Sequence, residues 1–118
     1  MRILSRRKLR EFWESRTNDA ERAERTLSAW WKIASHVEWS NWGELKKTFG
    51  SADRIGNCVV FDVGNNDFRL IARVNFRNTI IYILKVMDHK EYLRKDPRNR
   101  GKSKWEDECG CHQPPPKP

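Results

Sequence analysis

The fold is decided by residues 57–87, which read NCVVFDVGNNDFRLIARVNFRNTIIYILKVM. Apolar and polar residues alternate with a period of two in much of this stretch, as they do in half-buried β-strands. Turn-forming residues interrupt it at 64–66 and at 77–78, because glycine and asparagine tolerate a positive φ. The stretch therefore predicts an antiparallel meander of three strands at 57–63, 67–76 and 79–87, with residues 54–56 as a short edge strand before it.

Apolar residues at helical spacing precede the predicted sheet. Residues 4–16 show this spacing after Ser5, which is placed to cap a first helix. Asn18 and Glu21 form the pattern of a capping box for a second helix. The apolar stripe of that second helix comprises Ala20, Ala23, Leu27, Trp30, Trp31 and Ala34. We therefore expect an α+β fold in which two N-terminal helices pack on one face of a small antiparallel sheet.

Two shorter helices and a tail complete the prediction. A short helical segment is expected within residues 40–49, and a second over 90–95, where the next proline stops it. Beyond that point, residues 98–118 are charged and then proline-rich, with few apolar residues, which indicates a flexible tail. The chain thus divides into a domain at 1–97 and a tail at 98–118.

The charge of the chain favours a polyanionic partner. Its 118 residues include 24 Lys and Arg against 16 Asp and Glu, a formal net charge of +8, and no fold requires such an excess. Nucleic acid is the first candidate, although basic residues also serve solubility. The longest apolar run is far shorter than the roughly 20 residues that span a bilayer, and the N-terminus lacks the apolar stretch of a secretory signal. We therefore expect a cytoplasmic protein that does not bind membranes.

Three cysteines are present, at positions 58, 109 and 111. Cys58 lies in an apolar segment and is expected to be a reduced core thiol, so the cysteines imply no disulfide framework. Cys109, Cys111 and His112 are three soft ligands within four residues, but a zinc site usually needs four. An exposed pair of thiols in a disordered end is therefore favoured over a metal site, and no cofactor is expected.

Two arginines share one face of the predicted middle strand. Because side chains alternate along a strand, Arg69 and Arg73 point away from the side of Leu70, which can meet the apolar stripe of the second helix. The arginine face is then turned to solvent or to a ligand. Guanidinium groups bind phosphate bidentately, so an RNA backbone would fit this face, and a merely solvated strand face is the alternative.

An imidazole and a phenol follow the last predicted strand, at His89 and Tyr92. A ribonuclease without a metal needs one group to take the proton of the 2′ hydroxyl, another to protonate the leaving oxygen, and cations to hold the phosphate. His89 and Tyr92 suit these tasks, or could stack on bases. A surface or hydrogen-bonded structural histidine is the alternative.

Two motifs in the chain resemble the HigB-type toxins of the RelE superfamily. Residues 59–71, VVFDVGNNDFRLI, are similar to the family's V-F-N-(V/I)-G-G-N-x-x-R-L-(I/V). Residues 81–92, IYILKVMDHKEY, are similar to its Y-I-R-x-V-x-T-H-x-E-Y-D. Residues 1–14 also resemble the family's first helix, and residues 53–57 resemble the segment that leads into its sheet. The resemblance therefore covers residues 1–96.

The resemblance implies a RelE-like fold with RNA on the sheet face away from the helices. It implies metal-independent cleavage of messenger RNA in the ribosomal A site, by attack of the 2′ oxygen. A HigA-type helix-turn-helix antitoxin would neutralise the toxin, and operator DNA would be bound only through their complex. The motifs indicate Arg69 as the phosphate contact, His89 as the acid or base, and Tyr92 as its aromatic neighbour. The supporting cations would be Arg73, Lys46, Lys47 and Lys85.

The second motif departs from the family close to the histidine. Leu84 replaces the family's arginine, Asp88 its threonine and Leu93 its aspartate; in the first motif Asn65 replaces a glycine. Strand alternation places Lys85 on the face opposite Leu84, so we do not expect Lys85 to replace the arginine. A non-catalytic basic module of the same fold, which binds RNA, the ribosome or an antitoxin, is therefore the alternative function.

Overall fold

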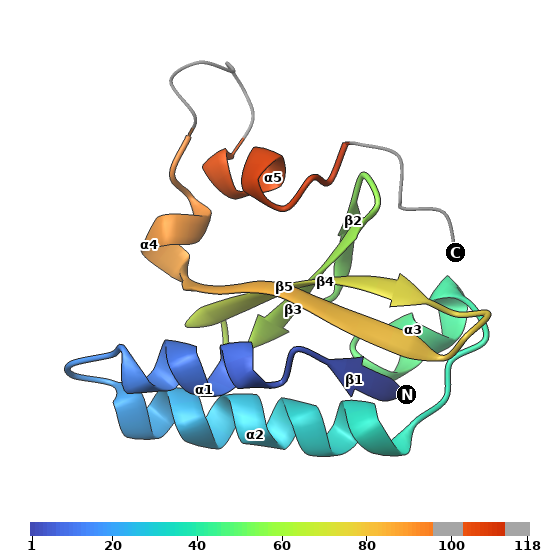
Figure 1. Cartoon of the computed structure of the whole chain (residues 1–118), viewed down its shortest axis with the longest axis horizontal. Helices are drawn as coiled ribbons and strands as arrows, with labels where there is room; N and C mark the ends of the chain where they lie inside the picture. The colour runs from blue at the N-terminus through green and yellow to red at the C-terminus, as the bar shows by residue number, and fades with distance from the viewer. Residues whose placement is uncertain (96–102, 113–118) are drawn as a thin grey trace.

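A five-stranded sheet forms the centre of the computed structural model, which describes residues 1–95 and 103–112 (Figure 1). The strands follow the order β1-β5-β4-β3-β2 across the sheet. Their bounds are β1 Arg2–Leu4, β2 Asp53–Ile55, β3 Cys58–Val63, β4 Phe68–Asn75 and β5 Ile80–Asp88. The helices are α1 Arg7–Glu14, α2 Ala20–His36, α3 Trp42–Thr48, α4 His89–Tyr92 and α5 Lys104–Glu108. Helices α1 and α2 lie on one side of the sheet and α5 lies on the other (Figure 1).

The predicted meander is confirmed. Strands β3, β4 and β5 pair antiparallel, with Phe61 opposite Leu70 and Leu70 opposite Val86. The turn between β3 and β4 places Gly64, Asn65 and Asn66 at positive φ, which is the conformation that these residue types tolerate best. The predicted edge strand is also confirmed, because β2 pairs antiparallel with β3.

The N-terminal strand was not predicted. Strand β1 pairs in parallel with β5, with Ile3 opposite Ile81, so the sheet is mixed and the expectation of a wholly antiparallel sheet is wrong. The first helix consequently begins at Arg7 and not at residue 4. Ser5 does not cap it; this residue lies in the connection, at φ 69°. Asp19, and not Asn18, precedes α2, and it makes no side-chain cap there.

The main core lies between the sheet and the N-terminal helices. The stripe of α2 is buried at Ala23, Leu27, Trp30 and Ala34, as predicted. It belongs to one apolar cluster with the inner face of the meander, to which β4 contributes Phe68, Leu70 and Ala72. Helix α3, capped by the Asn41 side chain, adds Leu45 to the same cluster. None of the helices in the described ranges has the length and hydropathy that a bilayer crossing requires.

A second apolar cluster covers the other face of the sheet. It joins Cys58, Val60, Ile71 and Met87 to Trp105, Cys109 and Cys111. The prediction of a flexible tail is therefore wrong for residues 103–112. Helix α5 begins with a capping box of Ser103 and Glu106, and the Trp105 side chain is only 2% exposed. The rest of the predicted tail, together with Pro97, lies outside the described residues.

Candidate active site

Three of the predicted site residues lie side by side where β5 ends and α4 begins. The guanidinium carbon of Arg69 is 4.9 Å from the centre of the Tyr92 ring. The Tyr92 ring in turn stacks on the His89 ring at 6.5 Å between centroids. Strand β5 runs directly into α4, and Arg69 pairs with Met87 in the β4–β5 ladder, which explains why an arginine and two α4 residues meet. The arrangement combines a cation, a phenol and an exposed imidazole.

The charge of Arg69 is already partly balanced within the protein. Its side chain is 11% exposed, and Nη1 lies 2.8 Å from Asp62 Oδ1. The second terminal nitrogen, Nη2, donates to Asn66 Oδ1 at 3.1 Å. Burial raises the pKa of Tyr92, although the Arg69 charge opposes this. Tyr92 is therefore a neutral phenol at neutral pH, able to donate a proton in a hydrogen bond.

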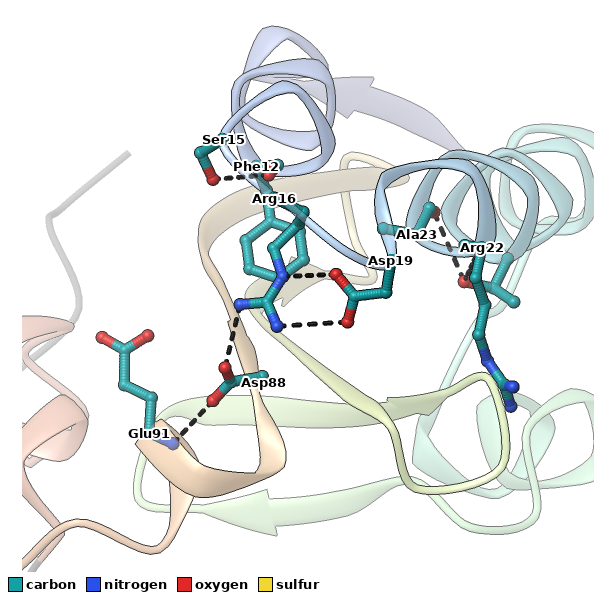
Figure 2. A network of polar contacts seen from close by, with 9 residues as sticks. Phe12, Ser15, Arg16, Asp19, Arg22, Ala23, Asp88 and Glu91 are labelled. Atoms are coloured by element: carbon teal, nitrogen blue, oxygen red, sulfur yellow. Dashed lines mark hydrogen bonds and ion pairs between the residues drawn. The ribbon is translucent and has the colours of Figure 1, made fainter.

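Arg16 connects the N-terminal helices to the helix that carries His89. It follows α1 and donates from Nε and Nη2 to Asp19, at 2.8 and 3.1 Å, and from Nη1 to Asp88 at 2.8 Å (Figure 2). Asp88 also accepts the backbone N–H of Glu91 at 2.8 Å, which caps α4. Sequence reasoning missed this network. Its only signal was that Asp88 departs from the family's threonine.

The electrostatics of the Arg16 network favour its charged form. Hydrogen bonding to Asp19 raises the pKa of Arg16, despite some burial, and hydrogen bonding to Arg16 lowers the pKa of Asp19. Burial alone would raise the pKa of Asp88, but the Glu91 N–H and Arg16 outweigh it, and the net shift is downward. The network is therefore ionised throughout the neutral pH range.

A β-bulge overturns the prediction that Lys85 lies on the sheet face opposite Leu84, which packs against the second apolar cluster. Ile71 pairs with Lys85 and Ala72 with Ile83, so Leu84 is an extra residue on β5. The bulge turns Lys85 to the same face as Ile71 and Met87, because cross-strand partners share a face. Lys85 thus lies on the face of the arginines, and it pairs with Glu91 at 3.0 Å and with Glu108. Burial opposes the charge of Lys85, but the two glutamates raise its pKa.

Arg73 lies on the same face. Contrary to the prediction, it is not open to solvent. Its Nη2 donates to the carbonyl oxygens of Gly110 at 3.1 Å and Cys109 at 3.4 Å. Ile71, between the two arginines on β4, is completely buried. The prediction that this face is turned to solvent is therefore wrong around Arg73 and Ile71, because residues 103–112 fold back over it.

The other two predicted cations lie away from this group. Lys46 donates from Nζ to the carbonyl oxygens of Gly50 and Ala52, at 2.7 and 2.9 Å, and so closes the turn after α3. Lys47 is exposed on the same helix. Helix α3 packs through Leu45 into the main core, on the other side of the sheet from Arg73. The structure does not bring these lysines together with Arg69.

The cysteine prediction is also wrong. Cys58 and Cys111 form a disulfide, with 5.1 Å between their Cα atoms, and the two residues are 53 positions apart in sequence. Cys109 is a free, buried thiol, and burial raises its pKa to about 11. The Nε2 atom of His112 lies within hydrogen-bond distance of Glu106 Oε1, at 2.9 Å. Because Cys111 is in a disulfide, the tail residues do not present the set of thiolates that a zinc site requires.

Comparison with known proteins identifies the family. The family model described as "HigB_toxin, RelE-like toxic component of a toxin-antitoxin system" matches residues 23–94. A protein named "mRNA interferase HigB" from Escherichia coli O6:H1 strain CFT073 is 27% identical over 95 residues, which cover 78% of this chain and 88% of the relative. An "mRNA interferase toxin HigB" from Escherichia coli K12 is 43% identical over 51 residues, 41% of this chain and 49% of the relative. Since the family match extends over more than half of the chain and includes both motifs, the chain belongs to the HigB toxin family.

Proposed function

We propose that this chain is the toxin of a type II toxin–antitoxin system and an endoribonuclease that cleaves messenger RNA on the ribosome. The observation that supports this most directly is the grouping of Arg69, Tyr92 and His89 at one end of the sheet. A cation, a neutral phenol and an exposed imidazole are the groups that metal-independent cleavage of RNA needs. The relatives' name, mRNA interferase, supports the same substrate.

The reaction follows from these groups. Arg69 binds the non-bridging oxygens of the scissile phosphate, in exchange for part of its pairing with Asp62. The 2′ hydroxyl loses its proton and its oxygen attacks the adjacent phosphorus, while the 5′ oxygen leaves and takes up a proton. His89 takes part in this proton transfer, and Tyr92 donates a hydrogen bond to the phosphate. The products are a 2′,3′-cyclic phosphate and a 5′ hydroxyl. The reaction consumes no water, because the 2′ oxygen replaces the 5′ oxygen on the phosphorus.

The partners follow from the same proposal. The protein acts in the cytoplasm, where the messenger is bound in the ribosomal A site. A HigA-type helix-turn-helix antitoxin neutralises the toxin. Operator DNA is bound only through the toxin–antitoxin complex. The family description, a toxic component of a toxin–antitoxin system, supports the existence of an antitoxin partner.

The test is primer extension on a message in a translating extract, with and without the protein. We expect cut sites that require ribosomes and disappear in the variants Arg69→Ala and His89→Ala. The control variant is Arg25→Ala, because Arg25 is an exposed arginine on α2, away from the candidate site. Unchanged cut sites in both site variants would contradict the proposed mechanism.

A second candidate function is a non-catalytic module of the same fold, which binds RNA, the ribosome or an antitoxin. The pairing of Arg69 with Asp62 favours it, because a guanidinium that is already bonded is less available to stabilise charge on a phosphate. This candidate predicts sedimentation with ribosomes but no cut sites in the primer-extension assay.

A further inference from the structure

Residues 103–112, which we call the C-terminal strap, lie across the sheet face that bears Arg73 and Ile71. Helix α5 is placed over this face, opposite α1 and α2 (Figure 1). Trp105 and Cys111 are 2% and 1% exposed, and both belong to the second apolar cluster, with Ile71 and Met87 of the sheet. The strap is therefore a packed part of the protein that covers the face on which an RNA backbone would lie.

The strap engages the same side chains that RNA would use. Arg73 donates to two strap carbonyl oxygens, and Lys85 pairs with Glu108. The Trp105 ring stacks on the Tyr92 ring at 5.4 Å and 17°. Carbonyl and carboxylate oxygens thus lie where phosphate oxygens would bind, and an indole lies where a base would stack. RNA bound on this face would therefore compete with the strap for the same groups.

The covalent attachment of the strap is at the first residue of β3, next to the turn between β2 and β3. Cys111 is bonded to Cys58, and its carbonyl oxygen accepts the backbone N–H of Asn57 at 2.7 Å. Gly56 has φ 57°, and a Cβ at this position would lie 2.0 Å from the Cys111 oxygen. The close approach of the strap to this turn therefore requires a glycine there.

We propose that the Cys58–Cys111 disulfide is a reducible latch, which holds the C-terminal strap over the RNA-binding face and frees that face when a dithiol reduces it. The proposal rests on the proposed function, since it concerns access to the same site. In the reaction, the S–S bond breaks, each sulfur takes up one electron and one proton, and the dithiol is oxidised to a disulfide.

The electrons come from outside the protein. The only free thiol in the described residues is that of Cys109, and burial raises its pKa to about 11. A protonated thiol is a poor nucleophile, so Cys109 does not open the neighbouring disulfide at neutral pH. An external dithiol must do so, and the state of the latch then follows the reducing power of the surroundings.

Reduction makes the strap displaceable. Without the disulfide, the strap is held by the buried Trp105, by the hydrogen bond from the Asn57 N–H to the Cys111 carbonyl oxygen, by the hydrogen bonds of Arg73 to neutral carbonyl oxygens, and by the partly exposed Lys85–Glu108 ion pair. A phosphate offers Arg73 charged oxygens in place of the two neutral carbonyl oxygens, and a guanidinium can bind phosphate bidentately. RNA can therefore replace the reduced strap, whereas the disulfide keeps an oxidised strap at the site.

The test uses the full chain, with a short fluorescein-labelled single-stranded RNA as the probe. RNA affinity is measured by anisotropy, and exposure of residues 104–111 by amide hydrogen exchange, before and after dithiothreitol. We expect reduction to speed exchange in the strap and to raise RNA affinity by about tenfold or more, since apparent affinity follows the open fraction. Cys111→Ser should bind tightly with or without the reductant. The matched control, Cys109→Ser, keeps the disulfide and should respond like the wild type.

The readouts separate failure of the latch from failure of the proposed function. Equal exchange in the oxidised and reduced strap would overturn the latch. Faster exchange with unchanged RNA affinity would show that the strap does not control the face, and this too would overturn the proposal. In either case, the loss of ribosome-dependent cut sites in Arg69→Ala would still support the nuclease, because this variant tests a residue of the candidate site and leaves the disulfide unchanged.

Discussion

Arg16 donates a hydrogen bond of 2.8 Å to Asp88, which follows it by 72 positions in the chain. Asp88 also caps α4 through the N–H of Glu91. Because α4 begins at His89 and ends at Tyr92, this ion pair fixes the position of the imidazole and the phenol relative to the sheet. The HigB-type motif that this stretch resembles has a threonine at this position, which can cap a helix but cannot form an ion pair with Arg16.

Substitutions at Asp88 separate the cap from the ion pair. Asp88→Ala removes both, and a lost cap costs about 1 kcal/mol of helix stability, so we expect faster amide exchange in α4 and weaker RNA cleavage. Asp88→Thr keeps a capping oxygen and should retain slower exchange in α4 than the alanine variant. Exchange by mass spectrometry and primer extension measure the two effects. Equal exchange in all three proteins would show that Asp88 does not hold α4.

Acid should weaken the protein through the Arg16 network. The pKa values of Asp19 and Asp88 are lowered in the folded chain, so the unfolded chain binds more protons in acid. Their contribution to stability is complete above about pH 5 and is lost as the pH falls through about 4 and below. Urea unfolding at a series of pH values should show this decline. Arg16→Gln should flatten it, while Arg25→Gln, an exposed control on α2, should leave the slope unchanged.

Reduction should lower the stability of the whole chain as well as free the strap. The disulfide joins residues 53 positions apart, and cross-links typically contribute about 2–4 kcal/mol, largely by restricting the unfolded chain. We expect the urea midpoint of the wild type to fall on reduction. The midpoint of Cys111→Ser should not respond to the reductant. A wild-type midpoint that is the same in both states would indicate that the strap docks without any help from the disulfide.

Trp105 should hold the strap independently of the disulfide. Its ring is 2% exposed and its Nε1 donates to the Tyr92 carbonyl oxygen at 3.2 Å. Removing a buried tryptophan side chain typically costs about 3–5 kcal/mol, so Trp105→Ala should accelerate amide exchange in residues 104–111 while β3 to β5 stay protected. Trp105→Phe keeps most of the apolar contact and should show a smaller effect. Acceleration across the sheet as well would mean that strap and sheet unfold as one unit.

The sequence predicts the parts of the fold that depend on repeated local patterns. The stripe of Ala23, Leu27, Trp30 and Ala34 repeats over about three turns, and the strands alternate around turns rich in glycine and asparagine, so their boundaries are predicted to within a few residues. Strand β1 has three residues and no such repeat. It exists because it pairs with β5, and that pairing is a tertiary contact.

The candidate site was predicted where a motif names residues and missed where contacts are distant. Arg69, His89 and Tyr92 belong to two motifs, and the structure brings them together. The face of Lys85 was predicted wrongly, because one extra residue at Leu84 changes the alternation without changing the composition.

The strap was missed for a related reason. Its segment is polar on average, and its few apolar side chains, above all Trp105 and Cys111, are buried only after the segment reaches the sheet. Pairing of cysteines far apart in sequence cannot be deduced from their spacing.

The two sulfurs of the disulfide also differ in their relation to the family. Cys58 lies on β3, inside the stretch that the HigB family model matches, and Cys111 lies beyond it. Without Cys111, Cys58 is a buried apolar side chain in a strand; without Cys58, the segment after α5 has no covalent tie. The bond therefore joins a strand that the family model matches to a segment that it does not match, and the loss of either sulfur alone would leave that segment attached to the domain only through the main chain.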